Sequence, residues 1–343
     1  MQRRGWTVAV GAAMVAVLTW LVLWVEVPYV AFVPGPTVDT LRTDSGRATG
    51  DQIIRVDGAV DTDSDGQLRM VTVSIVDRPR LIEAIWYWIS DDYAVVPREF
   101  VYPPDKTDKD IENESKEQFA SSQVSAETAA LRELGCPVHV AVTGFTAGSR
   151  LDDQLKKGDT ISEYDGEAVT SVKRLETLLG ERPKQQHTLS YVRDGKRGEL
   201  HVTPAQTKDE LLGLFLRQQQ PCTYDVVFDS DVQKIGGPSA GLIFALTIID
   251  KVQPEDLTGG HKIAGTGEID DDGVVGAIGG VAQKLLAAKR DGATVFLVPK
   301  NNCADAVAND PGGLTLVEVG TLDDALTALE ALRSGGTPKL CGR

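Results

Sequence analysis

Residues 237–241 have the sequence Gly-Pro-Ser-Ala-Gly, which places Ser239 where a glycine-rich loop meets a predicted helix over 239–249. Glycines allow the backbone to approach a substrate closely, and free N–H groups at a helix start can hold a developing oxyanion. The motif therefore predicts Ser239 as a nucleophile, with Gly237 and Pro238 shaping an oxyanion loop. Serine is also a common helix N-cap, so a purely structural role stays open from this motif alone.

A serine nucleophile needs a base, and histidine is the first candidate. The same motif fits the Gly-x-Ser-x-Gly elbow of α/β-hydrolases, in which an acid and a histidine follow the serine along the chain. Only His261 follows Ser239, 22 residues later and beside the turn Gly259-Gly260, which leaves little room for the strand and acid loop of such a triad. The other histidines lie upstream, in predicted strands: His139, His187 and His201. A histidine base is therefore not expected.

Lys284 is the alternative base, on a helix predicted over 280–291. The neighbouring positions on the same helix face are small and apolar: Gly280, Val281, Ala287 and Ala288. A lysine amine among such residues would be desolvated, and desolvation favours the neutral form that can accept a serine proton. Lys289 follows Leu285 and Leu286 and could extend from a core-facing helix in the same way. Periodicity alone does not choose between the two lysines.

The block from Gly237 to Pro299 carries several motifs in a fixed order. After the serine loop come Thr266-Gly267-Glu268-Ile269, Gly276-Ala277-Ile278-Gly279-Gly280-Val281, Lys284, Ala287-Ala288 and Val298-Pro299. This block resembles the proteolytic domain of Lon proteases. The resemblance implies a Ser–Lys dyad in which Ser239 attacks the peptide carbonyl, Lys284 takes and returns the proton, and Thr266 contacts the lysine amine. Gly236 stands where the family has an acidic residue before the motif, so that carboxylate has no counterpart here.

An upstream segment, residues 124–206, resembles a PDZ domain of bacterial proteases. The resemblance rests on Lys157-Gly158-Asp159-Thr160-Ile161 and the turn Asp165-Gly166, between predicted strands over 138–142 and 187–192 and beside a helix over 172–179. Gly148-Ser149-Arg150-Leu151 departs from the usual Gly-Ser-Pro-Ala. PDZ domains add an extended peptide to a sheet edge, and the expected contact residues are Val138, His139 and Val140. A small β-rich spacer is the alternative interpretation.

The N-terminal segment contains an uncharged run from Trp6 to Val25, long enough to span a bilayer. Arg3 and Arg4 precede the run and Glu26 follows it, so the positive-inside rule predicts a cytoplasmic tip at 1–5, a single-pass anchor in the cell membrane at 6–25 and an extracytoplasmic remainder. A cleaved signal peptide is the alternative. The run is longer than an ordinary signal h-region and no small-x-small cleavage site follows it, which favours the anchor.

Residues 26–123 are predicted to form a separate juxtamembrane β-rich region that ends in a charged linker. Gln67–Ile75 alternates like a half-buried strand, and 103–123 is dense in Lys, Asp and Glu, as in a solvated linker or exposed helix. Four cysteines without a CxxC pair fit an oxidising compartment: Cys136, Cys222, Cys303 and Cys341. Three connectivities are possible, of which Cys303–Cys341 is favoured, and four unpaired thiols are the alternative.

The bulk composition limits the partners. A net charge of −15 repels nucleic-acid backbones, so no nucleic acid is expected. The chain has no Gly-x-x-x-x-Gly-Lys-[Ser/Thr] loop, so no ATP is expected either. Neither a cofactor nor a metal is predicted. Protein or peptide substrates are the expected partners, and the oligomeric state stays open, a homo-oligomer included.

Together these patterns predict an α/β (α+β) multidomain chain. Its last third mixes strands over 224–228, 263–269 and 294–298 with a closing helix over 321–332, giving a Lon-like domain at 212–335 and a tail at 336–343. The whole order resembles the PDZ-containing Lon-like membrane proteases of Gram-positive bacteria, which implies an ATP-independent endopeptidase. The rival hypothesis is a binding or scaffold protein with an inactive Lon-like domain. The presence of Ser239, Lys284 and Thr266 favours the protease.

Overall fold

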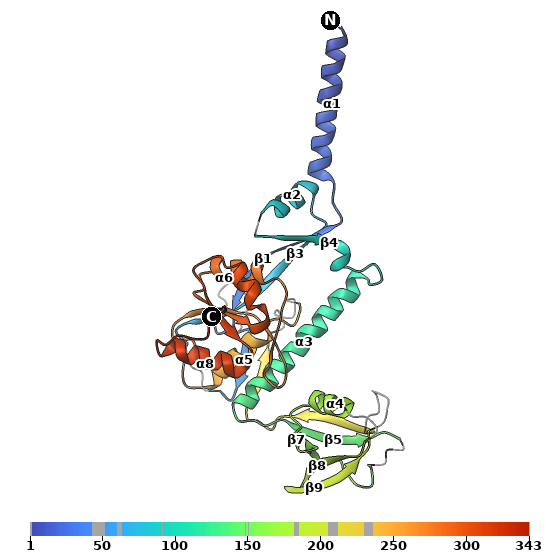
Figure 1. The fold of residues 1–343 in the computed structure, drawn as a ribbon, viewed down its shortest axis with the longest axis vertical. Coiled ribbons are helices and arrows are strands. Elements are labelled where there is room, and N and C mark those ends of the chain that lie inside the picture. The colour runs from blue at the N-terminus through green and yellow to red at the C-terminus, as the bar shows by residue number, and fades with distance from the viewer. Residues whose placement is uncertain are drawn as a thin grey trace.

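The computed structural model describes residues 2–42, 52–59, 64–90, 92–147, 149, 151–181, 185–204, 212–229 and 236–342. Figure 1 shows a large domain, a small domain below it and a long N-terminal helix, α1 (Gln2–Trp24), that extends away from both. The small domain comprises residues 139–219, and helix α3 (Asp108–Glu133) leads into it from the large domain.

The large domain is built on a mixed six-stranded sheet with the order β16-β15-β12-β3-β1-β4. The strands are β1 (Tyr29–Asp39), β3 (Gln67–Asp77), β4 (Ala94–Pro97), β12 (Lys262–Gly265), β15 (Val295–Pro299) and β16 (Thr315–Val319). β3, β12, β15 and β16 are mutually parallel, and β1 is antiparallel to both of its neighbours. Two short pairs lie outside this sheet: β2 (Ile54–Asp57) with β11 (Asp225–Phe228), and β13 (Glu268–Ile269) with β14 (Val275–Gly276).

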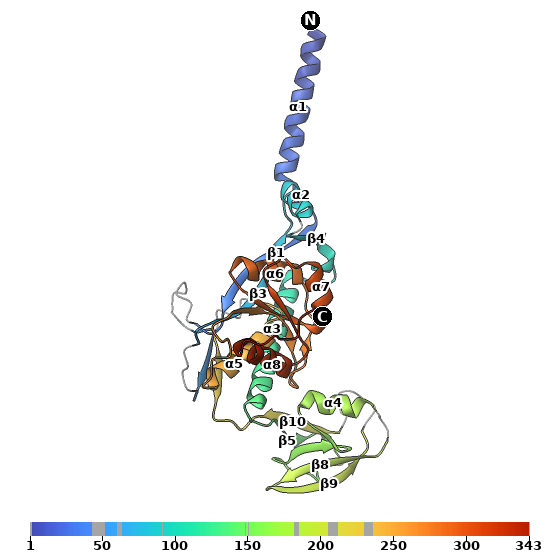
Figure 2. The same ribbon diagram turned by 60° about the vertical axis from the view of Figure 1, so that its left-hand side comes forward.

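Both faces of the sheet are buried at its centre, because alternate side chains of the central strands enter two different cores. On β15, Val295 and Leu297 join one core, and Phe296 and Val298 join the other. The first core contains α5 (Gly241–Val252), in which every residue is buried, and α8 (Leu322–Arg333). The second contains α6 (Val281–Arg290) and α7 (Cys303–Ala308). Figure 2 shows the two helix layers on opposite sides of the strands.

Helix α3 links the two domains and is not a flexible linker. It begins with a capping box in which Thr107 and Asp110 satisfy each other's backbone N–H groups. Its charged first turns are exposed, whereas its second half packs on α5, where the rings of Phe119 and Phe244 meet edge to face at 5.7 Å. The part of the charged segment from Asp108 onward is therefore the exposed start of a helix, one of the two predicted forms.

The small domain is a five-stranded sheet with the order β10-β5-β6-β8-β9, to which a short β7 is added beside β6. Its strands are β5 (His139–Phe145), β6 (Thr160–Tyr164), β7 (Glu167–Ala168), β8 (His187–Arg193), β9 (Lys196–Val202) and β10 (Leu214–Gln219). Helix α4 (Val172–Glu181) buries Leu175, Leu178 and Leu179 against this sheet.

The predicted segmentation differs from this arrangement in two places. Residues 26–123 are not a separate region, because β1 and β3 lie inside the sheet of the large domain. β10 belongs to the small domain, although residues 212–335 are predicted as one catalytic unit. Both differences have the same cause: each strand pairs with a partner far away along the chain, and local periodicity carries no information about such pairing.

Two disulfides join the four cysteines. Cys303–Cys341 is the predicted pair and is confirmed, and Cys136–Cys222 is the other. Cys136 lies just before β5 and Cys222 just after β10, so this second bond joins the two segments by which the chain enters and leaves the small domain.

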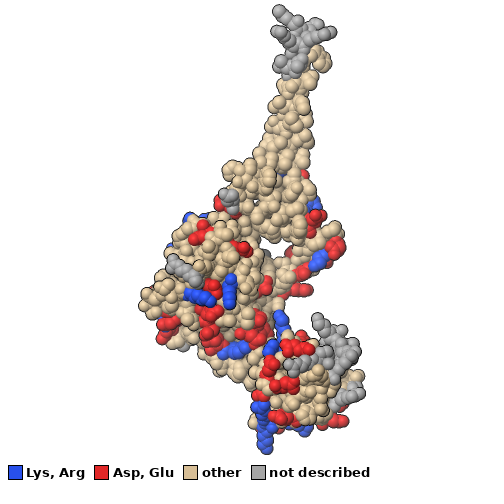
Figure 3. Space-filling model, viewed as in Figure 1, with Lys and Arg blue, Asp and Glu red and all other residues tan. Residues whose placement is uncertain are grey.

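The N-terminal part carries α1, α2 (Leu81–Ile89) and a 3₁₀ turn after β4 (Arg98–Phe100). Within the part of the chain that the structure describes, no helix combines the length and apolar character needed to traverse a bilayer. The side chains of residues 2–5, 7 and 8, which include Arg3 and Arg4, lie outside the described set, so the anchor at 6–25 stays a prediction. Figure 3 shows that charged side chains gather on the two domains and are sparse along the described part of α1.

Candidate active site

Ser239 lies in the turn that leads into α5, which begins at Gly241, two residues later than predicted. Ala240 occupies the N-cap position and makes no side-chain cap. Ser239 is therefore not the helix cap, and the structural role that the motif left open does not apply. Its Oγ accepts a hydrogen bond of 2.9 Å from Nζ of Lys284.

The glycines on either side of Ser239 meet two different needs, a left-handed backbone at Gly237 and a close approach at Gly241. Gly237 has φ +87°, in the left-handed region that favours glycine. At Gly241 a Cβ would lie 2.8 Å from both the Ile269 side chain and Oγ of Ser122, and Ser122 itself donates to the carbonyl of Pro238 at 2.9 Å. A side chain at 241 would therefore displace the loop that presents the serine.

Gly237 and Pro238 shape this loop, and neither offers a free N–H in this structure. The N–H of Gly237 donates to the carbonyl of Ser115 at 3.2 Å, and proline has no N–H. Their place in an oxyanion loop stays a prediction. Their contribution is to the path of the backbone.

Lys284 belongs to α6, which begins after Gly280 in the left-handed conformation, with φ +70°. The side chain is buried, and its Nζ donates to Ser239 Oγ at 2.9 Å and to Thr266 Oγ1 at 3.0 Å. Burial lowers the pKa of Lys284 to about 8, against the opposing effect of the nearby Glu268 charge. A substantial fraction of the amine is therefore neutral in mildly alkaline solution.

The structure separates the two lysines that sequence periodicity left equivalent. Nζ of Lys289 donates to the carbonyl of Pro311 at the surface and makes no contact with the serine. His261 precedes β12 and does not line the cavity around Ser239. Of the three candidate bases considered, Lys284 alone contacts the serine hydroxyl.

Thr266 fixes the position of Ser239 from the end of β12. Its hydroxyl donates to the carbonyl of Ser239 at 3.0 Å, and the N–H of Gly267 donates to the same carbonyl at 2.9 Å. The predicted strand over 263–269 is interrupted here into β12 and β13, since Thr266 and Gly267 turn their polar groups toward the serine.

A cavity of about 750 Å³ opens in front of Ser239 and Lys284. One wall is formed by the loop 236–240 and by Gly280 and Gln283 near the start of α6. A further, apolar part of the lining comes from β1, β3, β4 and α3: Phe32, Met70, Val73, Ala94, Val96 and Phe119. The sequence analysis did not predict this part of the lining. The only sequence signal for it was the alternation of apolar and polar residues over 67–75, which predicts a strand.

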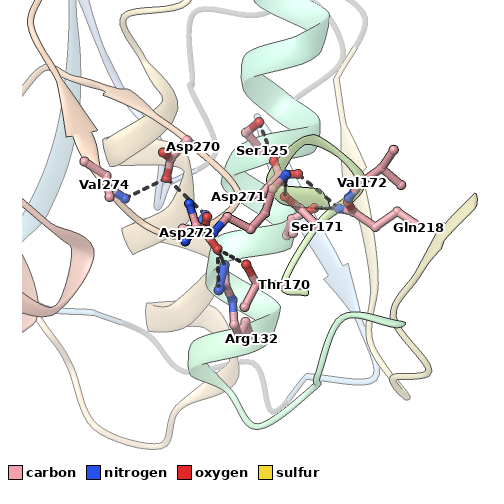
Figure 4. Close-up of polar contacts among 12 residues, drawn as sticks. Ser125, Arg132, Thr170, Ser171, Val172, Gln218, Asp270, Asp271, Asp272 and Val274 are labelled. Carbon is pink, nitrogen blue, oxygen red and sulfur yellow. Dashed lines mark hydrogen bonds and ion pairs between the residues drawn. The ribbon is translucent and has the colours of Figure 1, made fainter. Parts of the chain in front are cut away.

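A second groove of about 540 Å³ shares Pro238 and Glu268 with this cavity and extends to Lys173 on α4 of the small domain. Hydrogen bonds hold the two domains together beside this groove (Figure 4). Asp272 accepts from Arg132 of α3 at 3.0 Å and from Thr170 of the small domain. Asp271 accepts from Ser125 at 2.7 Å. The turn after β13 is thereby tied to both α3 and the small domain.

The predicted peptide contacts Val138, His139 and Val140 are wrong. β5 lies inside the sheet: Val140 pairs with Gln218 of β10 on one side and with Ile161 of β6 on the other, and its side chain is fully buried. A strand with both neighbours in place has no edge for a peptide. In the described part of the small domain the outer strands are β9 and β10, and β10 is the one that contacts α4.

A serine hydroxyl in contact with a buried, pKa-lowered lysine, on an α/β scaffold, is an arrangement suited to a serine hydrolase. Residues 228–329 match the family model of the Lon protease (S16) C-terminal proteolytic domain. This part of the chain is therefore a Lon-type proteolytic domain, as the ordered motifs predict.

Curated relatives agree with this family. The chain is 49% identical over 69 residues to a Lon protease of Clostridioides difficile, covering 20% of this chain and 8% of that protein. It is 37% identical over 110 residues to a Lon protease of Xanthomonas oryzae, covering 31% and 12%. A Lon protease of Endomicrobium trichonymphae is 25% identical over 280 residues, covering 70% and 34%. The chain thus spans about a third or less of the length of these three relatives.

Solved structures similar to this chain include the PDZ domain of an SdrC-like protein from Listeria monocytogenes, with 22% identity over 22% of this chain and 85% of that one and a TM-score of 0.21. Another is the second domain of a Listeria protein, with 19% identity, 24% and 85% coverage and a TM-score of 0.21.

Proposed function

We propose that this chain is an ATP-independent endopeptidase, attached to the membrane through α1, in which Ser239 is the nucleophile and Lys284 the general base. The observation that carries the proposal is the 2.9 Å contact between Lys284 Nζ and Ser239 Oγ, made by a buried amine whose pKa is lowered to about 8. Such an amine is neutral often enough to take the serine proton, whereas an ordinary lysine is almost fully protonated near neutral pH.

The reaction follows from these contacts. Neutral Lys284 takes the proton of Ser239 as Oγ attacks the carbonyl carbon of the scissile bond. The resulting ammonium then gives that proton to the leaving amide nitrogen, which departs as the new N-terminus and leaves an ester on Ser239. Lys284 next takes a proton from water, the hydroxide attacks the ester, and the proton returns to Ser239 Oγ.

Substrate selection by the small domain is supported by the groove that runs from the catalytic loop to Lys173. We place the bound peptide on β10, since the edge of β10 lies beside α4 and the side chain of Phe215 on this strand is exposed. A peptide added to a sheet edge stays extended, which is the conformation that a protease cleaves. Selection of this kind would replace ATP-driven unfolding, for which the sequence has no nucleotide-binding loop.

Membrane attachment is supported by the surface of α1, where large apolar side chains are exposed: Trp6, Val10, Met14, Val15, Val17, Leu18, Trp20, Leu23 and Trp24. Apolar residues on all sides of a helix require a partner of low polarity. The two disulfides suit an oxidising compartment, in line with catalytic and small domains outside the cytoplasm.

Labelling with a serine-directed fluorophosphonate tests the nucleophile and its base together. Wild type should be labelled, Ser239→Ala should not, and Lys284→Ala should react far more slowly. Lys289→Ala is the matched control, because it removes a lysine from the same helix without touching the serine. Equal labelling of Lys284→Ala and wild type would refute the proposed base.

A further inference from the structure

Helix α2 exposes a stripe of apolar side chains to the solvent, whereas a helix at a water-facing surface normally buries such a stripe. Its exposed apolar side chains Ile82, Ile85, Trp86 and Ile89 are spaced i, i+3, i+4 and i+7 and so share one helix face. On an ordinary surface helix that stripe is buried and the polar face is exposed. Here Ala84 is the buried residue of the helix, and Trp88, 78% exposed, adds to the open apolar surface.

The position of α2 indicates what covers this stripe. Its first N–H, at Leu81, donates to the carbonyl of Val25 at 2.9 Å, and the N–H of Val27 donates to Pro79 at 3.0 Å. The guanidinium of Arg80 lies 5.2 Å from the ring centre of Trp24. Helix α2 thus lies at the foot of α1 (Figures 1 and 2), and both helices expose large apolar side chains.

We infer that α2 is an interfacial helix that lies on the lipid bilayer with Ile82, Trp86 and Ile89 in the acyl boundary. The inference rests on the proposed membrane attachment. Tryptophan and isoleucine facing lipid, with arginine at the headgroup level, is the composition of such helices, and indole rings favour this depth. Arg78 and Arg80 immediately precede α2 and can meet lipid phosphates.

This docking would set the position of the active site. β4 follows α2 after a short turn and pairs with β1, and its residues Ala94 and Val96 line the cavity in front of Ser239. A helix held at the bilayer therefore holds one wall of that cavity near the membrane surface. The substrate class that fits this position is an extended segment just outside a transmembrane or lipid-attached protein, and a freely diffusing protein fits it less well.

Tryptophan quenching by brominated lipids tests the inference on the full chain in phosphatidylcholine vesicles. The five tryptophans are residues 6, 20, 24, 86 and 88. The variant Trp6→Phe/Trp20→Phe/Trp24→Phe keeps tryptophans only on α2 and is called the α2 reporter. The variant Trp86→Phe/Trp88→Phe keeps them only on α1 and is called the α1 reporter. We expect brominated lipids to quench the tryptophan fluorescence of the α2 reporter. Lipids brominated near the headgroup should quench it more strongly than lipids brominated deep in the acyl chain.

Each outcome has a distinct meaning. Quenching of the α1 reporter without the α2 reporter would refute the interfacial helix and leave the membrane attachment standing, with a protein partner or water on α2. Quenching of neither would refute both. A second variant in the α2 reporter, Ile82→Asn/Ile89→Asn, should abolish its quenching. Val307→Asn, at an exposed apolar position on α7, is the control that should leave it unchanged.

Discussion

The hydroxyl of Thr266 donates to the backbone carbonyl of Ser239 at 3.0 Å and accepts from the amine of Lys284 at the same distance. Because its one proton is directed at the carbonyl, the hydroxyl can only accept from the lysine. Once Lys284 is neutral, one of its N–H groups stays with Thr266, and its lone pair can turn to Ser239 Oγ, to which the amine donates in this structure. In the proposed mechanism, Thr266 is therefore a positioning residue that sets the direction of proton transfer.

Thr266→Val should keep the shape of the site and remove both hydrogen bonds. We expect kcat to fall by about 10–100-fold, the cost of leaving buried polar groups unpaired, with little change in KM. Thr266→Ser restores the hydroxyl and should recover most of the rate. Steady-state kinetics on a short fluorogenic peptide measure both, and a valine variant with wild-type kcat would show that the threonine does not position the lysine.

Lys284→Arg should be as inactive as Lys284→Ala, since a guanidinium stays charged and cannot accept the serine proton. The expected loss of kcat is about 10²–10⁴-fold, the usual contribution of a general base. Lys289→Arg is the paired control and should retain wild-type activity, because that lysine contacts a surface carbonyl. Retention of more than a few per cent of activity in Lys284→Arg would contradict a lysine base.

Activity should rise with pH and level off above about 8, the value to which burial lowers the pKa of Lys284. The sign follows from the active form: below this pKa the amine is protonated and inert, so kcat/KM should fall about tenfold for each further pH unit. A profile governed by a group near ~6.5, and abolished by His261→Ala, would point instead to histidine.

Glu268→Gln should move this profile to lower pH. The Glu268 carboxylate stabilises the ammonium form of Lys284 and raises its pKa, so neutralising it makes the amine easier to deprotonate. Asp310→Asn, which removes an equal charge from a loop outside the cavity lining, serves as the comparison and should leave the profile in place. An unshifted Glu268→Gln profile would mean that this charge does not reach the lysine.

Phe215→Asp should impair protein substrates selectively if peptides bind along β10. The side chain is more than half exposed on this edge strand, so the fold should tolerate the change. We expect a severalfold higher KM for proteins with an extended tail and unchanged kinetics for short peptides. His201→Asp on β9, the opposite edge, is the control. Equal KM values for tailed proteins in Phe215→Asp and wild type would exclude β10 as the docking edge.

The chemistry of the site was more predictable than its surroundings. Ser239, Thr266 and Lys284 lie in ordered motifs, and the structure brings all three within hydrogen-bond distance. The choice between Lys284 and Lys289 came from the family resemblance, because both lysines have apolar neighbours at helical spacing in the sequence. The two lysines can be told apart only by their contacts with residues outside the helix, which the sequence does not give.

Strand pairing was the less predictable part. The segment around β5 has a strand pattern. Whether a peptide can pair with this strand depends on whether β10, about 70 residues later in the chain, already pairs with it. In the same way, the alternation over 67–75 predicted a strand, but its place beside β12 in the catalytic sheet comes from long-range parallel pairing. Such pairing is set by the packing of the whole domain and leaves no local trace.

The Cys136–Cys222 bond has a mechanical consequence. In the proposed function, a substrate tail held on the small domain and still attached to a folded body or a membrane would pull on that domain. The cross-link lies at the base of the domain and joins its two connections, so tension passes from one connection to the other through sulfur. The load therefore enters α3 and not only the segment that leads through β11 to the serine loop. Under the proposed function, the bond would divert part of such a load away from the loop that carries Ser239.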